Sequence, residues 1–153
     1  MTPRTVVERV IRASPGRVWE ALTDLQGMER VLSGVQRIEV LTEGGFDVGT
    51  RWRETRRMLG KEATEEMYVT ACEPLELYVV EADSHGTHYV SEFELLTAGP
   101  ETTTVRMTFS AVPPGGFMGL LSKVLGPLGV KAVSRAIAKD LDDVATAVEG
   151  RGA

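Results

Sequence analysis

The stretch RWRETRRM, residues 51–58, is the strongest candidate for chemistry in the chain, because it combines five charged residues with Trp52 and Met58. In a strand, side chains two apart share a face, so Glu54 and Arg56 share the face of Trp52 and Met58. The opposite face carries three arginines, and each one buried without a partner would cost several kcal/mol. We therefore expect the Trp52 face to point inward. There, Glu54 and Arg56 would hold the polar end of a ligand or transfer protons, unless they form only a structural or solvated ion pair.

The stretch DSHGTH, residues 83–88, holds both histidines of the chain. Asp83, His85 and His88 are residue types that bind transition metals, but a metal needs three or four converging ligands and this stretch has the composition of a hairpin turn. A Ser–His–Asp triad is disfavoured because neighbours in a turn rarely converge, and no nucleophile elbow is present. Cys72 is the single cysteine and is expected to be a small buried residue or a passive surface thiol. We expect neither a metal site nor a cofactor.

Composition indicates an ordinary globular protein. The 153 residues, of which 42% are hydrophobic and 25% charged, fit a single domain spanning residues 1–153. The net charge of -5 gives no electrostatic reason to expect nucleic acid or an anionic membrane as a partner. No apolar run reaches the roughly 20 residues of a membrane span, and the N-terminus lacks the apolar core of a signal peptide. We therefore expect a cytoplasmic protein.

Two short helices are predicted directly after the first strand. Residues 4–13 carry β-branched residues in loose alternation and are typical of a strand. Ser14 is a favourable N-cap, and Pro15 suits the first helical position because its missing N–H would be unpaired there. Apolar residues then follow at helical spacing until Gly27, and residues 28–32 form a second short helix.

The remainder of the chain favours strands followed by one long helix. Six further strands are predicted over residues 35–41, 51–59, 63–73, 75–83, 87–96 and 102–112. The sequence PPGG at 113–116 ends the sheet, and apolar residues then recur at three and four from Phe117 to Val148, with a kink expected at Gly126-Pro127. Such a sheet has one face to bury, and one long amphipathic helix can cover it. The predicted fold class is α+β.

This order of elements resembles the START-like (SRPBCC) superfamily. The resemblance is carried by ASPGRVWEALTD at 13–24, VGTRWRE at 48–54 and CEPLELYVVEADS at 72–84, and it covers essentially the whole chain. It implies a helix-grip fold, in which a curved seven-stranded antiparallel sheet and the C-terminal helix enclose a ligand cavity. The superfamily includes polyketide cyclase/dehydrase-type proteins, Bet v 1-like plant proteins and lipid-transfer domains. Since its members include enzymes, carriers and receptors, the resemblance implies no particular reaction.

Strand alternation predicts which residues line that cavity. The facing of the 75–83 strand is ambiguous, because both Leu77 with Val79 and Tyr78 with Val80 are apolar sets. Several methionines fall on inward positions, where they suit a variable ligand but are equally ordinary core residues. The predicted ligand-binding residues are Trp52, Glu54, Arg56, Met58, Met67, Val69, Tyr89, Ser91, Phe93, Met107, Phe109, Met118 and Leu121.

Two functions follow from these expectations. The first is binding of a small hydrophobic molecule, such as a lipid, an isoprenoid or an aromatic polyketide-like compound. The second is a cyclase or dehydratase that positions a reactive chain and moves protons in the same cavity. A protein-binding module is a third class and would need an exposed apolar patch. The sequence is compatible with a monomer or a homodimer.

Overall fold

The computed structural model describes residues 4–58, 60–84, 86–112 and 127–149. The chain begins with strand β1 (Arg4–Ile11), helix α1 (Pro15–Thr23), the 3-10 helix η1 (Leu25–Gly27) and helix α2 (Met28–Val31). The later elements are β2 (Val35–Val40), β3 (Arg51–Met58), β4 (Lys61–Glu73), β5 (Leu77–Ser84), β6 (Thr87–Gly99), β7 (Thr102–Val112) and α4 (Pro127–Glu149).

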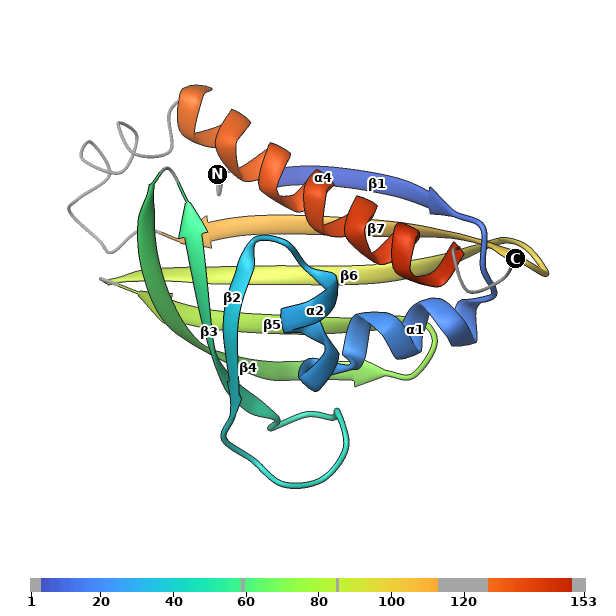
Figure 1. Cartoon of the computed structure of the whole chain (residues 1–153), viewed down its shortest axis with the longest axis horizontal. Coiled ribbons are helices and arrows are strands. Elements are labelled where there is room, and N and C mark those ends of the chain that lie inside the picture. Colours follow the sequence, from blue (N-terminus) through green and yellow to red (C-terminus); the bar gives the residue numbers. More distant parts are fainter. Residues whose placement is uncertain (1–3, 59, 85, 113–126, 150–153) are drawn as a thin grey trace.

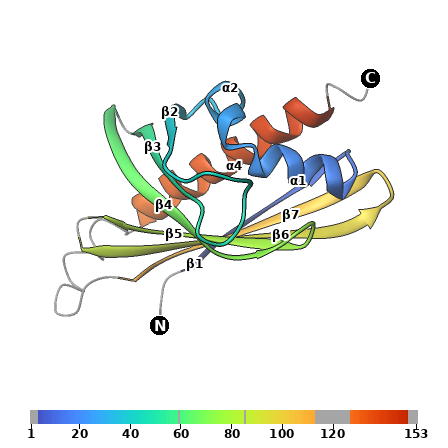
Figure 2. The same ribbon diagram turned by 90° about the horizontal axis from the view of Figure 1, so that it is seen from below.

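The seven strands form one antiparallel sheet in the order β1-β7-β6-β5-β4-β3-β2. The sheet is strongly curved, and α4 runs across its concave side with α1 and α2 beside it (Figures 1 and 2). The first strand pairs with the last, so that β1 and β2 lie at opposite edges. This is the helix-grip arrangement predicted from the sequence.

The short helices begin where the sequence predicts. Ser14 has extended backbone angles, and its Oγ accepts a hydrogen bond from the backbone N–H of Arg17 at 3.4 Å. Asp24 caps the next short segment in the same way, through the N–H of Gly27 at 3.1 Å. These caps satisfy donors that a helix start leaves unpaired, and they direct Val18 and Leu22 into the core.

Helix α4 presents its apolar stripe to the sheet and to α1. The buried members of this stripe are Ile137, Leu141, Val144, Ala145 and Val148. Its last turn is tied to the start of the chain: the Arg17 guanidinium donates to the Val148 carbonyl at 2.7 Å, and Glu149 accepts from the Arg12 backbone N–H at 2.9 Å. The C-terminal helix is therefore packed from Ile137 to Val148 and also held at its last turn.

The structure resolves the facing of β5. Tyr78, Val80 and Ala82 are the buried set, and the strand begins two residues later than predicted. A turn with Leu75 at a φ of 70° precedes it, and the β4–β5 register shifts between Val69 and Ala71. The first part of the predicted helical region, residues 117–126, lies outside the described residues.

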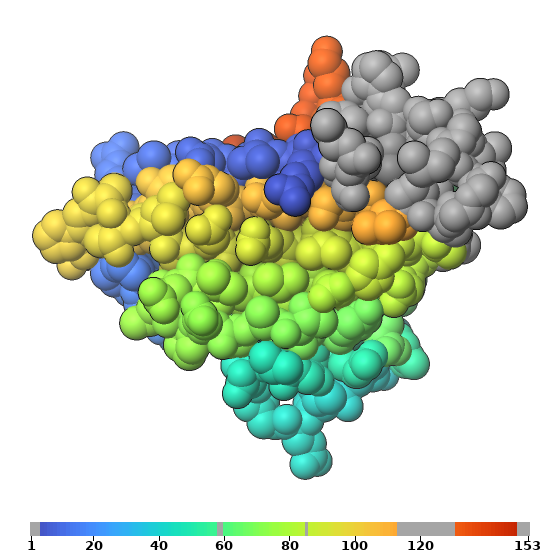
Figure 3. All heavy atoms as spheres, turned by 180° about the vertical axis from the view of Figure 1, so that it is seen from behind, coloured from blue at the N-terminus to red at the C-terminus, as the bar shows by residue number. Residues whose placement is uncertain are grey.

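The convex face of the sheet carries the charges that the sequence places outside. Arg51, Arg53 and Arg57 are all exposed. They pair with Glu66 at 2.8 Å, Glu39 at 3.4 Å and Glu62 at 3.8 Å, respectively. Figure 3 shows this side of the molecule, where β4, β5, β6, β7 and β1 follow one another. Among the described helices, none is both long enough and apolar enough to cross a bilayer.

Candidate functional site

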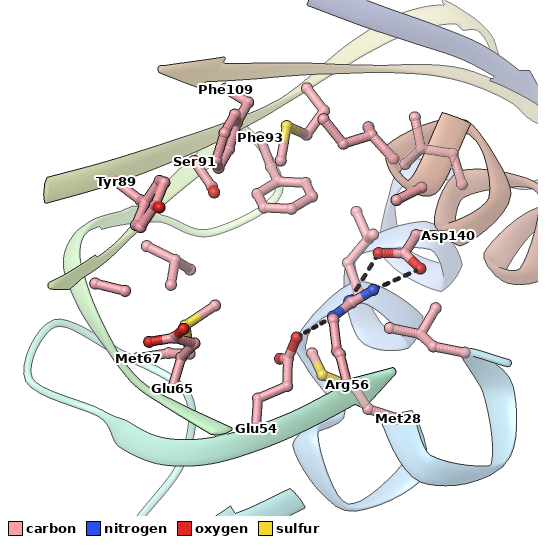
Figure 4. A pocket seen from close by; sticks show the side chains of 18 of the residues that line it. Met28, Glu54, Arg56, Glu65, Met67, Tyr89, Ser91, Phe93, Phe109 and Asp140 are labelled. Atoms are coloured by element: carbon pink, nitrogen blue, oxygen red, sulfur yellow. Dashed lines mark hydrogen bonds and ion pairs between the residues drawn. The ribbon is translucent and has the colours of Figure 1, made fainter. Parts of the chain in front are cut away.

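A cavity of about 440 Å³ lies between the concave face of the sheet and α4. Its volume falls within the range of about 300–1,000 Å³ that is usual for small-molecule sites. Side chains from β3, β4, β5, β6 and β7 form one wall, and residues of α1, α2 and α4 close the other side (Figure 4). Six aromatic residues take part: Phe46, Trp52, Tyr78, Tyr89, Phe93 and Phe109.

Most of these rings contact one another. Tyr78 is 3% exposed and stacks on Phe93 with ring centroids 4.6 Å apart. The edges of Trp19 and Phe46 meet it at 5.6 and 5.0 Å. Burial raises the pKa of the Tyr78 phenol, so its hydroxyl stays protonated. The wall is thus a set of flat, rigid surfaces, which suits a flat ligand.

One region of the cavity wall is charged. The Glu54 carboxylate, in a residue only 6% exposed, accepts from Trp52 Nε1 at 3.2 Å and from Arg56 Nε. The terminal nitrogens of Arg56 donate to the two carboxylate oxygens of Asp140 at 3.1 and 2.8 Å. Arg56 therefore joins β3 to α4 through a two-pronged ion pair across the cavity (Figure 4). We call Glu54, Arg56 and Asp140 the polar cluster.

Burial and charge act in opposite directions on the polar cluster. Burial alone would lower the pKa of Arg56, but Glu54 and Asp140 raise it by more, so the guanidinium stays charged. Burial, together with the negative charges of Glu54 and Asp143, raises the pKa of Asp140 above its ordinary value despite the opposing influence of Arg56. Asp140 is thus a carboxylate that takes up a proton more readily than one in water.

Two neighbours complete the polar end. A Cβ at Gly34 would come within 3.4 Å of Arg56 Nη1, so the absence of a side chain there leaves room for the guanidinium to reach Asp140. Glu65 on β4 lies directly opposite Glu54 in the β3–β4 register. Its carboxylate accepts from Ser84 Oγ at 2.8 Å, and it lines the same cavity.

Most of the residues predicted from the sequence surround this cavity. Its lining includes Trp52, Glu54, Arg56, Met67, Tyr89, Ser91, Phe93, Met107 and Phe109. Val69 is 2% exposed and belongs to the packed core, but it is not among the residues that line the cavity. Met58 ends β3, but its side chain is outside the description, and Met118 and Leu121 lie outside the described residues. Ligand binding by these residues stays a prediction.

Sequence reasoning missed many of the lining residues, and three of these matter for the polar and aromatic character of the wall: Asp140, Tyr78 and Glu65. Asp140 looks like a solvent-facing helix charge, yet it lies three residues after Ile137 and four before Val144, which is the spacing of the apolar stripe. The sequence does not determine which face of its strand Tyr78 occupies, because that strand is apolar on both faces. Glu65 is two residues before Met67, so strand alternation alone places it on the inner face.

His88, one of the two histidines in the DSHGTH stretch, belongs to a separate cluster on the outer face of the sheet. His88 Nδ1 is 2.6 Å from Asp83 Oδ1, and Nε2 is 2.5 Å from Glu81 Oε1. The Tyr68 hydroxyl donates to the other oxygen of Asp83 at 3.0 Å. Hydrogen bonds to Asp83 and Glu81 raise the pKa of His88. No group of residues able to hold a metal ion occurs in the part of the chain that the structure describes, and His85 lies outside it.

Comparison with solved structures supports the fold. The aromatase/cyclase Zhui from Streptomyces sp. R1128 aligns with a TM-score of 0.82 and 21% identity, over 100% of this chain and 97% of that one. Norcoclaurine synthase from Thalictrum flavum aligns with a TM-score of 0.77 and 16% identity, over 97% and 94%. The di-domain aromatase/cyclase BexL from the BE-7585A biosynthetic pathway gives 0.74 and 16%, over 97% of this chain and 50% of that one.

Sequence comparison gives the family. A search of curated proteins found no significant match. The family model described as "Polyketide cyclase / dehydrase and lipid transport" matches residues 2–149, which is nearly the whole chain. With the curved sheet, the C-terminal helix and the cavity between them, this match shows that the chain belongs to the polyketide cyclase/dehydrase and lipid transport family.

Proposed function

We propose that this protein binds a small, mainly apolar aromatic molecule in the cavity between the sheet and α4. The observation that supports the proposal is the combination of six aromatic side chains with one polar cluster around a space of about 440 Å³. Few, well-placed polar groups in an otherwise apolar cavity are typical of sites that fix the orientation of a small ligand.

The aromatic wall favours a flat ligand over a flexible chain. Tyr78 and Phe93 already stack, and so do Tyr89 and Phe109, whose ring centroids are 5.7 Å apart. Aromatic pairs of this kind contribute about 0.5–1.5 kcal/mol each beyond the area they bury. A ligand ring that extends either stack would gain this interaction without ordering further side chains, because the rings are held by the protein.

A second candidate is a cyclase or dehydratase reaction in the same cavity. It is favoured by Asp140, a carboxylate with a raised pKa beside a charged guanidinium, and by the family to which the chain belongs. In such a reaction a carboxylate removes a proton from a CH₂ between two carbonyls, and the resulting carbanion forms a C–C bond to another carbonyl of the chain. The new alkoxide takes the proton, and loss of water then gives an aromatic ring. The cavity contributes by holding the chain folded.

The binding proposal is tested by filling the cavity. Ala136 on α4 lines the cavity, whereas Ala138 on the same helix is exposed. We expect the neutral naphthalene dye prodan to bind the wild type with micromolar affinity and to quench tryptophan emission, since Trp52 is at the wall. Ala136→Phe should weaken binding about tenfold or more, and Ala138→Phe should leave it unchanged. Equal binding to both variants, or no binding to the wild type, would overturn the proposal.

The enzymatic candidate needs a separate assay. The purified protein is added to a polyketide synthase that releases reactive poly-β-ketone chains, and products are followed by mass spectrometry. A catalyst should produce a cyclised product that has lost water, and Ala136→Phe should abolish it while Ala138→Phe does not. An unchanged product profile with wild-type protein would leave binding as the function.

A further inference from the structure

We infer that the cavity selects ligands that present a positive charge or hydrogen-bond donors to its polar end, and that it discriminates against carboxylates. The inference deepens the proposed function and rests on it, because it assumes that a small molecule enters the cavity. It names the chemical class of that molecule, which the aromatic wall alone does not.

The first argument is the charge balance of the wall. Among the described residues whose charged groups face the cavity, Glu54, Glu65 and Asp140 are acidic and Arg56 is basic. Glu81 also borders the cavity, but its carboxylate is hydrogen-bonded to His88 on the outer face. Carboxylates thus outnumber guanidinium groups three to one. Because the cavity is walled by protein, whose effective dielectric constant is lower than that of water, this excess repels anions more strongly than it would on the open surface.

The second argument is that Arg56 has little left to offer an anion. Its Nε donates to Glu54, and both terminal nitrogens donate to Asp140. One N–H remains on each terminal nitrogen, but these two do not point in the same direction, so a two-pronged pair with a ligand carboxylate would require displacing Asp140 or Glu54 and would leave that carboxylate without its partner. Leaving one partner of such an ion pair without the other costs more than a hydrogen bond to the ligand returns.

The third argument is the juxtaposition of two glutamates. Glu54 and Glu65 are direct partners across β3 and β4, and side chains at such positions have Cβ atoms about 4.5–5.5 Å apart. Like charges at this spacing repel each other. Glu65 Oε1 accepts from Ser84, and a carboxylate has about four lone-pair positions, so both carboxylates retain capacity to accept. A ligand ammonium or hydroxyl beside them would relieve the repulsion.

The predicted ligand class is an arylalkylamine or, with weaker affinity, a neutral phenol or alcohol of similar shape. The rings would lie against the aromatic wall, and the donor group would face Glu54 and Glu65. Aryl carboxylic acids and free fatty acids should bind worst. This order follows from the charges of the wall and is independent of ring size.

The test uses three probes with the same ring and different end groups: 2-(1-naphthyl)ethylamine, 2-(1-naphthyl)ethanol and 1-naphthylacetic acid. Each is measured at neutral pH by displacement of prodan and by calorimetry. We expect the amine to bind most tightly and the acid least. The amine-to-acid ratio of affinities should be about tenfold or more, which corresponds to about 1.4 kcal/mol.

Matched variants locate the effect. Glu65→Gln keeps the acceptor for Ser84 but removes one inward charge, and it should reduce the amine-to-acid ratio several-fold. Glu66→Gln removes a neighbouring charge that pairs with Arg51 outside the cavity, and it should leave the ratio unchanged.

The outcomes separate the two proposals. Equal binding of amine and acid, or preference for the acid, in a protein that still binds prodan would overturn the charge selectivity and leave the proposed function standing. An equal response of the ratio to Glu65→Gln and Glu66→Gln would overturn it as well. Failure of prodan and all three probes to bind would overturn both proposals.

Discussion

At the scale of single residues, Arg56 contributes most to this cavity. It bridges a strand and a helix that are 84 positions apart in the chain, and it neutralises one of the two carboxylates that it contacts. Replacing such a group leaves charges behind, and an unpaired buried charge is far more destabilising than the pair is stabilising. Arg56 is therefore expected to be important for folding whatever the ligand is.

We predict that Arg56→Met lowers the free energy of unfolding by about 3 kcal/mol at neutral pH, because Glu54 and Asp140 lose their partner. Arg57→Met is the control, since Arg57 is exposed and its pair with Glu62 is long at 3.8 Å; its effect should stay below about 0.5 kcal/mol. Urea denaturation measures both. The loss in Arg56→Met should shrink as the pH falls, because protonation removes the stranded charges. Similar stabilities of the two variants would contradict this role.

The sequence predicts part of the polar cluster and not the rest. Glu54 and Arg56 were assigned to the inner face because the alternative would bury three arginines, and both lie at the cavity wall. Asp140 was missed because a charge on a helix is usually solvated, and only its partner on a distant strand makes an inward position tolerable. A single sequence does not report that partner.

At the scale of elements, the outer face of the sheet contains its own charged group. His88 on β6 lies between Asp83 and Glu81 on β5, and Tyr68 on β4 joins through Asp83. Hydrogen bonds to Asp83 and Glu81 raise the pKa of His88 above its ordinary value of 6.5. The protonated imidazole therefore donates to both carboxylates of the neighbouring strand, whereas the neutral imidazole has only one N–H and can donate to one of them.

We predict a pH-dependent stability that depends on His88. Because the pKa is higher in the folded state, the contribution is fully present below about pH 6.5 and is lost as the pH rises through the raised value. His88→Gln should remove this slope, and the difference from wild type should stay below about 1 kcal/mol because the group is near the surface. Urea denaturation from pH 6 to 9 measures it. A wild-type-to-variant difference that does not change over this range would contradict the prediction.

The boundaries and facing of strands show where sequence patterns suffice. The last strand was predicted with its observed ends, because its alternation of apolar and polar residues is uninterrupted. The strand from Leu77 was ambiguous because Leu77 to Val80 is apolar on both faces. The turn at Leu75 and the register shift in β4 determine its facing, and both depend on contacts between strands.

At the scale of the whole molecule, the two ends of the chain stabilise each other. β1 pairs along its length with β7 and also contacts α4. Arg17 in α1 donates to the Val148 carbonyl at the last turn of α4, where a helix leaves carbonyl groups without partners. The closure of the helix over the sheet thus depends on residues near the N-terminus.

We predict that Arg17→Ala lowers the free energy of unfolding by about 1–2 kcal/mol, since a charged donor to a helix carbonyl is lost. Arg12→Ala is the matched control, because Arg12 is exposed and contacts Glu149 through its backbone N–H, which the substitution retains. Hydrogen exchange should show faster exchange confined to the last turn of α4 in Arg17→Ala. Identical exchange in the two variants would argue against a stabilising role for the Arg17–Val148 hydrogen bond.

The pairing of the first strand with the last also has a consequence for synthesis on the ribosome. β1 leaves the ribosome before the other six strands, but its partner strand begins only at Thr102, so the chain between them must be made before β1 can pair. At translation rates of about 5–20 residues per second, this takes on the order of 5–20 s. During that time RTVVERVI is an unpaired, β-branched segment, which is a hazard for aggregation in the nascent chain. The charged residues Arg4, Glu8 and Arg9 interrupt the apolar run, and we expect them to reduce aggregation of this segment until β7 has been synthesised.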